Sequence, residues 1–204
     1  MARYGPEHKE ATRARMLESA GRRFKSDGLD GAGIATLVAD AGLTNGAFYG
    51  HFASKDDLIA SVVAQQLAEQ TARVADLPPG PASVEMFVAA YLSPVHRDDI
   101  AGGCPNAALL DEIGRRDDAI RGAYTEGVRR LIAAIAQHLD VGDEQDAQER
   151  AIALFTLLVG SVQTARAVTD RQLSDRILAT AYTHAMAIAS PPTPPARRAR
   201  RDTA

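Results

Sequence analysis

The sequence predicts an all-α fold in which a small N-terminal group of helices precedes a larger helical body. Helix-favouring residues, chiefly alanine, leucine, arginine and glutamate, are abundant, whereas aromatic residues make up only 5% of the chain. Apolar residues recur at helical spacing, and the alternating apolar and polar runs of half-buried strands are absent. A chain of 204 residues can bury a substantial core, as one domain or as a small domain plus a larger one.

The first helix is predicted over about residues 7–27, where apolar side chains keep helical spacing: Met16, Leu17, Ala20 and Phe24. Asp27-Gly28 ends this helix. Two short helices follow, near residues 34–41 and 45–51. Gly42 between them supplies the left-handed turn that lets the chain reverse within a few residues.

A long helix is predicted from after Ser54 to about residue 75, because Ser54 is a favourable N-cap and acidic residues follow it. Pro78-Pro79-Gly80-Pro81 is the clearest internal break, and a second break runs from Ser93-Pro94 to Gly102-Gly103. The helix between the two breaks has an apolar face that includes Val84, Phe87, Val88, Tyr91 and Leu92. Further helices are predicted near residues 105–115, 117–139, 145–169 and 173–189.

The last two of these helices are strongly apolar along one side. Such faces either pack inside the domain or bury against a second copy of the chain in a four-helix interface. Residues 191–204 are rich in proline and arginine and are predicted to form a disordered basic tail; an inert tail is favoured over an arm that contacts DNA. The predicted domains are therefore residues 1–55 and 56–190.

Charge is distributed unevenly around a formal net charge of -3. Residues 1–26 hold seven basic and three acidic side chains, a net charge of +4, whereas residues 61–190 have a net charge of -6. This asymmetry suggests a basic end that meets an acidic partner, although a solvated helix face would give the same pattern. No apolar run approaches the length of a membrane span and no secretory signal is visible, so we expect a cytoplasmic protein without a membrane partner.

Several classes of site are not expected. The single cysteine, Cys104, excludes an internal disulfide framework and a cysteine-rich zinc module. The histidines His96, His138 and His184 lie far apart without metal-binding spacing, so neither a metal nor another cofactor is expected. Glycine-rich phosphate loops, nucleophile elbows and zinc-helix motifs are also missing, which argues against an enzyme.

Residues 33–58 form the most informative block. The first short helix has an inner apolar stripe, Ile34, Leu37, Val38 and Ala41. Thr44 can cap the second helix, whose buried side comprises Ala47, Phe48 and Phe52. The outer side is small and polar, formed by Thr44, Asn45, Gly46 and Gly50. A helix with so slim an exposed face can enter the DNA major groove, which is about 12 Å wide.

This block resembles the helix-turn-helix of the TetR family of regulators. The matching residues are Ala41-Gly42-Leu43, Gly46, Phe48-Tyr49, His51-Phe52, Ser54-Lys55 and Leu58. With the basic first helix, the resemblance covers about residues 8–60. It implies an N-terminal three-helix DNA-binding domain of the helix-turn-helix type, followed by a C-terminal helical domain for ligand binding and dimerisation.

The resemblance also implies roles for individual residues. Thr44, Asn45 and Ala47 would approach base edges, and Thr36 would add a groove or backbone contact. Contacts to phosphate, which fix register, would come from Tyr49, His51 and Lys55. Simple packing at a helix edge is the alternative for Tyr49 and His51. Gly33 departs from the family pattern, since many relatives carry Ser or Thr there, and this leaves the cap of that helix in question.

Cys104 is the main candidate in the sensing half. Pro105 is favoured at the first position of a helix and so places Cys104 near the N-cap, where free N–H groups and the helix dipole favour a reactive thiolate. The segment resembles the Gly-Cys stretch of NemR-like members of the family, which respond to electrophiles or oxidants; a buried structural cysteine is the simpler interpretation. Candidate pocket-wall residues, on helices that enclose the ligand in this family, are Phe87, Tyr91, Leu110, Ile113, Tyr124, Val128, Phe155 and Gln163.

The sequence therefore predicts a ligand-responsive transcription regulator, of which a repressor is the usual form in this family. It would bind a palindromic double-stranded DNA operator as a homodimer and be released by a small molecule or a reactive electrophile. A helical protein-interaction module without DNA binding is the alternative.

Overall fold

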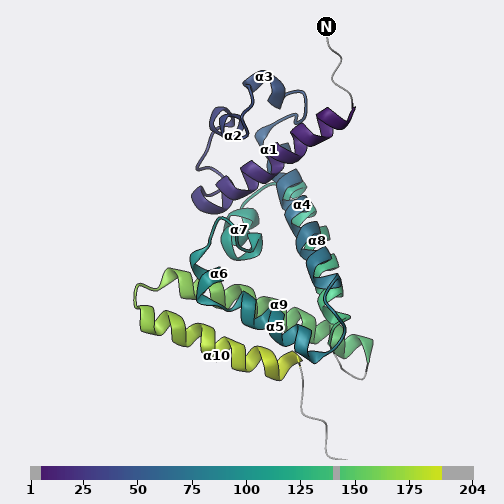
Figure 1. Cartoon of the computed structure of the whole chain (residues 1–204), viewed down its shortest axis with the longest axis vertical. Helices are drawn as coiled ribbons and strands as arrows, with labels where there is room; N and C mark the ends of the chain where they lie inside the picture. The colour runs from purple at the N-terminus through teal and green to yellow at the C-terminus, as the bar shows by residue number, and fades with distance from the viewer. Residues whose placement is uncertain (1–5, 140–142, 190–204) are drawn as a thin grey trace, which may run out of the picture.

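The computed structural model describes residues 6–139 and 143–189, and within these ranges every regular element is a helix (Figure 1). The prediction of an all-α fold is confirmed. A small group at one end comprises α1 (Pro6–Asp27), α2 (Ile34–Asp40) and α3 (Asn45–Phe48). The larger body comprises α4 (Lys55–Ala75), α5 (Pro81–Tyr91), α6 (Pro94–Asp98), α7 (Pro105–Gly114), α8 (Asp118–Ala136), α9 (Glu144–Ala167) and α10 (Arg171–Ala189).

The predicted helices agree with the observed ones to within a few residues, with one exception. The segment after Ser93 was expected to be a break, but it contains the short helix α6. Ser93 starts this helix because its hydroxyl accepts the His96 N–H at 3.1 Å, and Pro94 occupies the first helical position. The predicted tail, residues 191–204, lies outside the described residues.

Aromatic side chains form the centre of the N-terminal group. Phe24 from α1 and Phe48 from α3 are almost fully buried together with Phe52. Gly42 has a φ of +69°, which confirms the left-handed turn expected between α2 and α3. Ser54 caps α4 as predicted, since its hydroxyl accepts the Asp57 N–H at 3.1 Å while Asp57 accepts the Ala53 N–H at 2.9 Å.

Helix α4 joins the two groups of helices. It contacts α1 at its beginning and packs along α8 for much of its length, as the two adjacent helices in Figure 1 show. Gly127 on α8 is buried against Leu67 on α4, and a β-carbon at this position would overlap the Leu67 side chain. The absence of a side chain at Gly127 therefore sets how closely the two helices approach.

The opposite end of the body is formed by α5, α9 and α10, with α9 and α10 packed side by side (Figure 1). Helix α7 lies between this layer and the N-terminal helices and contacts α1, α4, α8 and α9. None of the helices within residues 6–139 and 143–189 is long and apolar enough to cross a membrane.

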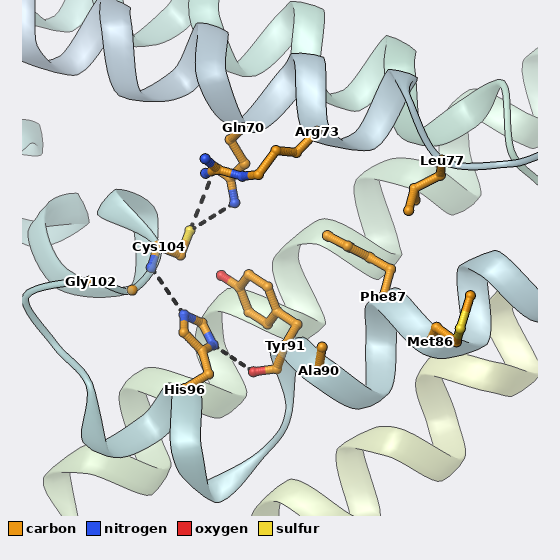
Figure 2. Close-up of a pocket in the computed structure, with 11 residues that line it drawn as sticks. Gln70, Arg73, Leu77, Met86, Phe87, Ala90, Tyr91, His96, Gly102 and Cys104 are labelled. Atoms are coloured by element: carbon orange, nitrogen blue, oxygen red, sulfur yellow. Dashed lines mark hydrogen bonds between the residues drawn. The ribbon is translucent and has the colours of Figure 1, made fainter.

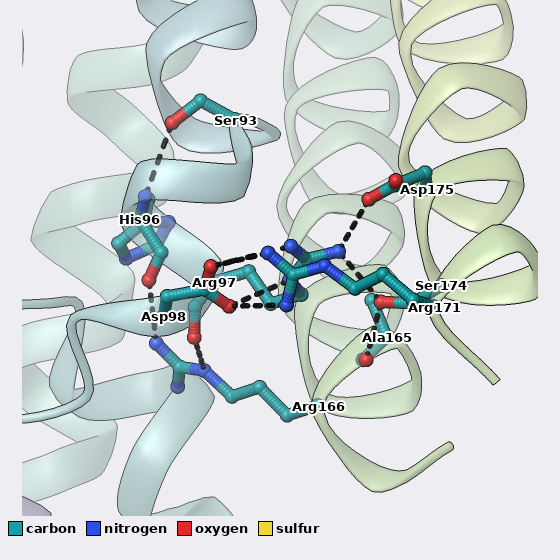
Figure 3. A network of polar contacts seen from close by, with 9 residues as sticks. All are labelled: Ser93, His96, Arg97, Asp98, Ala165, Arg166, Arg171, Ser174 and Asp175. Carbon is teal, nitrogen blue, oxygen red and sulfur yellow. Dashed lines mark hydrogen bonds and ion pairs between the residues drawn. The ribbon is translucent and has the colours of Figure 1, made fainter. Parts of the chain in front are cut away.

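A polar network fastens α6 to α9 and α10 (Figure 3). Arg97 is only 3% exposed and is paired with Asp98 at 2.8 Å and with Asp175 at 2.6 Å. Arg97, followed by Arg171, holds the pKa of Asp98 well below its usual range through hydrogen bonds. Arg166 on α9 donates to the backbone carbonyls of His96, Arg97 and Ala107, and so holds the segment on both sides of Cys104.

Two glycines on α8 test the packing of α4 against α8. Gly127→Ala is expected to destabilise the protein by about 1–3 kcal/mol, because the added methyl group must displace Leu67. Gly122→Ala, on the same helix, is expected to stabilise it by about 0.5–1 kcal/mol, because the site is open and alanine favours the helix. Urea unfolding of both variants measures the difference, and equal effects would contradict the close approach of α4 and α8.

Candidate functional site

The helix-turn-helix surface presents most of the predicted DNA-binding residues to solvent. Thr36 on α2 and Thr44 and Asn45 at the start of α3 are exposed, whereas Ala47 is half-buried. Tyr49 is 66% exposed and its ring rests edge-on against Phe48, with ring centres 5.2 Å apart. The buried phenylalanines thus position an outer face of small and polar residues.

The helix caps in this region differ from one another. Thr44 occupies the N-cap of α3 as predicted, but its side chain makes no capping hydrogen bond. Gly33 occupies the N-cap of α2 and has no side chain to offer. The Thr44 hydroxyl is therefore not engaged in the capping bond that the sequence suggested.

His51 and Lys55 are half-buried and lie among other charged groups. Burial lowers the pKa of His51, and the cations Lys9 and Arg13 lower it further, so the ring is held neutral. Its Nδ1 atom is buried without a hydrogen-bond partner among the described residues. Lys55 Nζ lies 3.9 Å from Asp30 Oδ1, so a DNA phosphate would compete with this carboxylate for the ammonium group.

Arg13 and Lys9 join this surface from α1. The Arg13 guanidinium lies 5.0 Å from the centre of the Phe52 ring and donates to Ser61 Oγ at 3.1 Å. Sequence reasoning counted both cations only as part of a basic helix. Their position beside His51 appears only when α1 crosses the helix-turn-helix.

A cavity of about 660 Å³ lies in the larger body, between α4, α5, α6 and the loop that leads into α7 (Figure 2). Among the predicted wall residues, Phe87, Tyr91 and Cys104 line it. The other predicted wall residues do not line it: Leu110, Ile113, Tyr124, Val128 and Phe155 belong to the core or pack against it, and Gln163 is also outside the lining. Tyr124 nevertheless lies near Cys104. The remaining lining residues are Gln70, Arg73, Leu77, Met86, Ala90, His96, Gly102 and Gly103.

Cys104 is the N-cap residue of α7, as expected from Pro105, and is 6% exposed. Two side-chain amides donate to its sulfur, Gln70 Nε2 at 3.2 Å and Asn106 Nδ2 at 3.3 Å. The Asn106 amide also donates to Gln70 Oε1 at 3.0 Å, which fixes the two amides relative to each other. The sulfur also lies 3.6 Å from Gln70 Oε1, to which the thiol can donate, so the two amides hold the Cys104 side chain in place.

His96 holds the backbone of Cys104. Its Nε2 accepts the Cys104 N–H at 3.0 Å, so Nδ1 carries the proton and donates to the Tyr91 carbonyl at 2.6 Å (Figure 2). Burial is the main cause that lowers the pKa of His96, and the positive charges of Arg166 and Lys25 lower it further. The neutral ring therefore ties α5, α6 and the first turn of α7 together.

Helix α7 also contacts the N-terminal helices. Lys25 Nζ on α1 donates to the Gly103 carbonyl at 2.9 Å, directly before Cys104. Glu112 near the end of α7 accepts the Leu29 N–H at 2.8 Å, and Arg116 pairs with Asp30 at 2.8 Å. The segment that carries the cavity cysteine thus also holds α1 and the turn that follows it.

Within the part of the chain that the structure describes, no group of three or more His, Cys, Asp or Glu side chains could hold a metal ion. The polar groups at the cavity are amides, a tyrosine, a histidine, an arginine and one thiol. This set suits hydrogen bonding to a small organic molecule.

Two family models match the chain. The model described as bacterial regulatory proteins, tetR family, matches residues 16–62, and the model described as tetracyclin repressor-like, C-terminal domain, matches residues 80–181. The HTH-type transcriptional repressor SCO4008 of Streptomyces coelicolor is 26% identical over 151 residues, which cover 70% of this chain and 68% of the relative. The HTH-type transcriptional repressor NemR of Escherichia coli K12 is 25% identical over 138 residues, or 65% of this chain and 69% of the relative.

Solved structures share the fold. The reduced form of E. coli NemR aligns with a TM-score of 0.76 over 90% of this chain and 99% of that structure, at 22% identity. A TetR-family regulator from Agrobacterium tumefaciens aligns with a TM-score of 0.68 over 86% of this chain and 98% of that structure, at 18% identity. At such low sequence identities, the structural similarity shows only that the fold is shared.

The role of His96 predicts a pH dependence of stability. Its pKa is lowered in the folded state from about 6.5, so the unfolded chain takes up the proton more readily as the pH falls. The free energy of unfolding is therefore expected to decrease between pH 7.5 and pH 5.5, and His96→Gln should make this decrease smaller. His51 acts in the same direction and is present in both proteins, so the difference between them isolates His96.

Urea unfolding at the two pH values measures this effect. His138→Gln, outside the cavity, is the control and should keep the wild-type decrease. An unchanged decrease in His96→Gln would show that the imidazole is not held neutral by the Cys104 N–H.

Proposed function

This chain belongs to the TetR family of bacterial regulatory proteins, and we propose that it is a repressor that binds a palindromic operator as a homodimer and leaves it when the cavity beside Cys104 is occupied. The family consists of DNA-binding transcription regulators, which accounts for the N-terminal motif. One observation carries the proposal: the residues matched to the family in the helix-turn-helix bury Phe48 and Phe52 and leave Thr44, Asn45 and Tyr49 exposed. This is the arrangement that a recognition helix needs in order to face the major groove.

The contacts to DNA divide into two kinds. Asn45 can pair with adenine, and Thr44 and Ala47 can touch thymine methyl groups, so these side chains would read base edges. Tyr49, Lys55 and His51 would contact phosphates, with Thr36 from α2 as a further contact. Lys9 and Arg13 add positive charge beside His51, which favours the approach of the DNA backbone.

The homodimer would form through α9 and α10. Exposed Leu173 and Ile152 are large apolar side chains on these two helices, and a shallow hollow between the helices is lined partly by Leu157 and Ile177. Pairing this face with its copy would give a four-helix interface with two-fold symmetry. The two recognition helices would then enter successive major grooves of a palindrome.

The cavity would communicate with DNA through α7. A ligand that pushes against Gly103 and Cys104 strains the bonds to Lys25 and His96 and so favours a different placement of α1. Such a ligand weakens DNA binding only to the extent that it binds more tightly to a conformer in which the spacing of the two recognition helices does not fit the operator. A regulator of this kind would act in the cytoplasm, where the chromosome lies.

A reactive electrophile is a second way to release the DNA. The Cys104 sulfur lines the cavity, and a cysteine thiolate can add to an electron-poor alkene. In that reaction the sulfur bonds to one alkene carbon, the carbon–carbon π bond breaks, and a proton is taken up at the neighbouring carbon. The added group would fill the cavity as a ligand does.

Tyr49→Phe tests DNA binding. The change removes the hydroxyl that would donate to a phosphate but keeps the ring against Phe48, so affinity for the operator should fall by about tenfold. Fluorescence anisotropy with DNA that flanks the protein's own gene measures the affinity, its salt dependence and the stoichiometry, for which a dimer predicts two chains per palindrome.

Tyr182→Phe is the matched control, because the Tyr182 hydroxyl bonds to Glu85 in the larger body. This variant should bind DNA like the wild type. If no specific, salt-sensitive binding is found, either with this DNA or in a selection from genomic fragments, the protein-interaction module becomes the better interpretation.

Cys104→Ser tests release by electrophiles. A small maleimide should lower the operator affinity of the wild type, and mass spectrometry should show one added group per chain because Cys104 is the only cysteine. The variant should bind the operator and keep it in the presence of the maleimide. Release of the Cys104→Ser variant at the same rate would exclude the thiol as the sensor.

A further inference from the structure

The two ends of the cavity differ in chemistry (Figure 2). One end is apolar and is formed by Leu77, Met86, Phe87 and Ala90. The other end is polar and is formed by Gln70, Arg73, His96 and the segment Gly102–Cys104. A molecule that fills the cavity must therefore itself have an apolar part and a polar part.

Positive charge gathers around the polar end. Arg73 lines the cavity at its solvent-exposed side, and among the described residues no carboxylate pairs with it. Lys25 is 9% exposed, and its ammonium group donates to the Gly103 carbonyl. Arg166 is half-buried, and its three hydrogen bonds all go to backbone carbonyls, which satisfy its N–H groups without cancelling its charge.

Negative charge nearby is much smaller. Among the described residues, no carboxylate lines the cavity. The exposed Asp99, which accepts the Gly102 N–H at 2.8 Å, acts on both Lys25 and Arg166, as does the Cys104 sulfur, and Asp98 acts on Arg166 as well. Burial lowers the pKa of both Lys25 and Arg166, which shows that their charged forms are kept at some cost. A negative charge placed in the polar end would offset that cost.

A hydrogen-bond donor is also available there. Tyr91 lines the cavity at 8% exposure, and its hydroxyl lies near the Cys104 sulfur but has no oxygen or nitrogen acceptor among the described residues. Buried hydroxyls are nearly always paired, so one that faces a cavity without a partner points to a missing acceptor. An acceptor oxygen on a ligand would satisfy it.

From this arrangement we propose that the cavity binds a small amphipathic carboxylate, with its anionic head at Arg73 and the Tyr91 hydroxyl and its apolar body against Met86 and Phe87. The inference rests on the proposed function, since it names the effector of the same cavity. A cationic ligand would add positive charge to a cavity that Arg73 lines and that Lys25 and Arg166 lie beside. A neutral ligand would add no counter-charge to that of Asp99, whereas an anionic head would.

Three matched probes test the ligand class: 4-phenylbutyrate, 4-phenylbutanol and 4-phenylbutylamine, which share an apolar body and differ in the head group. At pH 7.5, calorimetric titration of the full-length protein should give an affinity for the carboxylate at least about tenfold higher than for the alcohol or the amine, because its head group makes charge-assisted hydrogen bonds. Arg73→Gln should reduce the affinity for the carboxylate to that for the alcohol. Arg130→Gln, an exposed arginine on α8, is the control and should keep the preference.

Tyr91→Phe provides a second, independent variant. Because the hydroxyl is unpartnered in the free protein, its removal should leave the thermal midpoint unchanged or raise it. The same variant should bind 4-phenylbutyrate about three- to tenfold more weakly, since one donor to the carboxylate is lost. A purely structural tyrosine would show lower stability and an unchanged head-group preference.

The proposal is overturned if the alcohol or the amine binds as tightly as the carboxylate, if Arg73→Gln keeps the preference, or if 4-phenylbutyrate shows no binding at millimolar concentration. These outcomes are separable from a failure of the proposed function. Carboxylate binding without any operator binding would contradict the repressor and keep the ligand class. Operator binding that is relieved by the amine and not by the carboxylate would keep the repressor and contradict the ligand class.

Discussion

The structure depends most on how the backbone at Gly103–Cys104 is held. Three helices form hydrogen bonds with this short stretch. Lys25 from α1 bonds to the Gly103 carbonyl, His96 from α6 to the Cys104 N–H, and Gln70 from α4 to the sulfur. Each partner can bond only because α7 begins at this point, which Pro105 dictates by its fixed φ and missing N–H. Closely packed interiors move between discrete arrangements, so a shift of this stretch requires these bonds to exchange together.

The rest of the larger body serves as a rigid frame for that stretch. Arg166 on α9 bonds the carbonyls on both sides of it, and the pairs of Arg97 with Asp98 and Asp175 fix α6 to α10. Separating the buried Arg97 from these half-exposed carboxylates would leave its charge without a partner, which makes this end costly to rearrange. The movable contacts therefore lie on the other side of α7, toward α1, where Lys25, Glu112 and the pair of Arg116 with Asp30 hold the N-terminal helices.

Most helix boundaries and turns were predictable from the sequence, because the residues that determine them act locally. Ser54 and Pro105 mark the helix starts through their own chemistry, and Gly42 marks its turn through the φ that only glycine adopts easily. Helix α6 was missed because five residues are too few for an apolar period, and Ser93-Pro94 is typical of a break as well as of a helix start. The cavity wall was the least predictable part: Gln70, Arg73 and His96 are polar residues whose neighbours are set by tertiary packing, whereas the apolar candidates Leu110, Tyr124 and Phe155 lie in the core.

The contacts at α7 also limit how strongly a ligand can act on DNA binding. Lys25 to Gly103 and Glu112 to Leu29 are hydrogen bonds of charged groups, worth about 1.5–3 kcal/mol each. His96 to Cys104 is a neutral one worth about 1 kcal/mol, so exchanging all three involves roughly 4–7 kcal/mol. The upper end of ordinary coupling between two sites is about 3 kcal/mol, or roughly 150-fold in operator affinity, and needs only part of these contacts to exchange. A ligand reaches this limit only if it binds the rearranged form more tightly by the same factor. Arg73 and the Tyr91 hydroxyl are the groups that can provide such a difference in affinity. A small movement changes the energy of a charged or hydrogen-bonded contact with a bound acceptor far more than it changes the energy of an apolar contact.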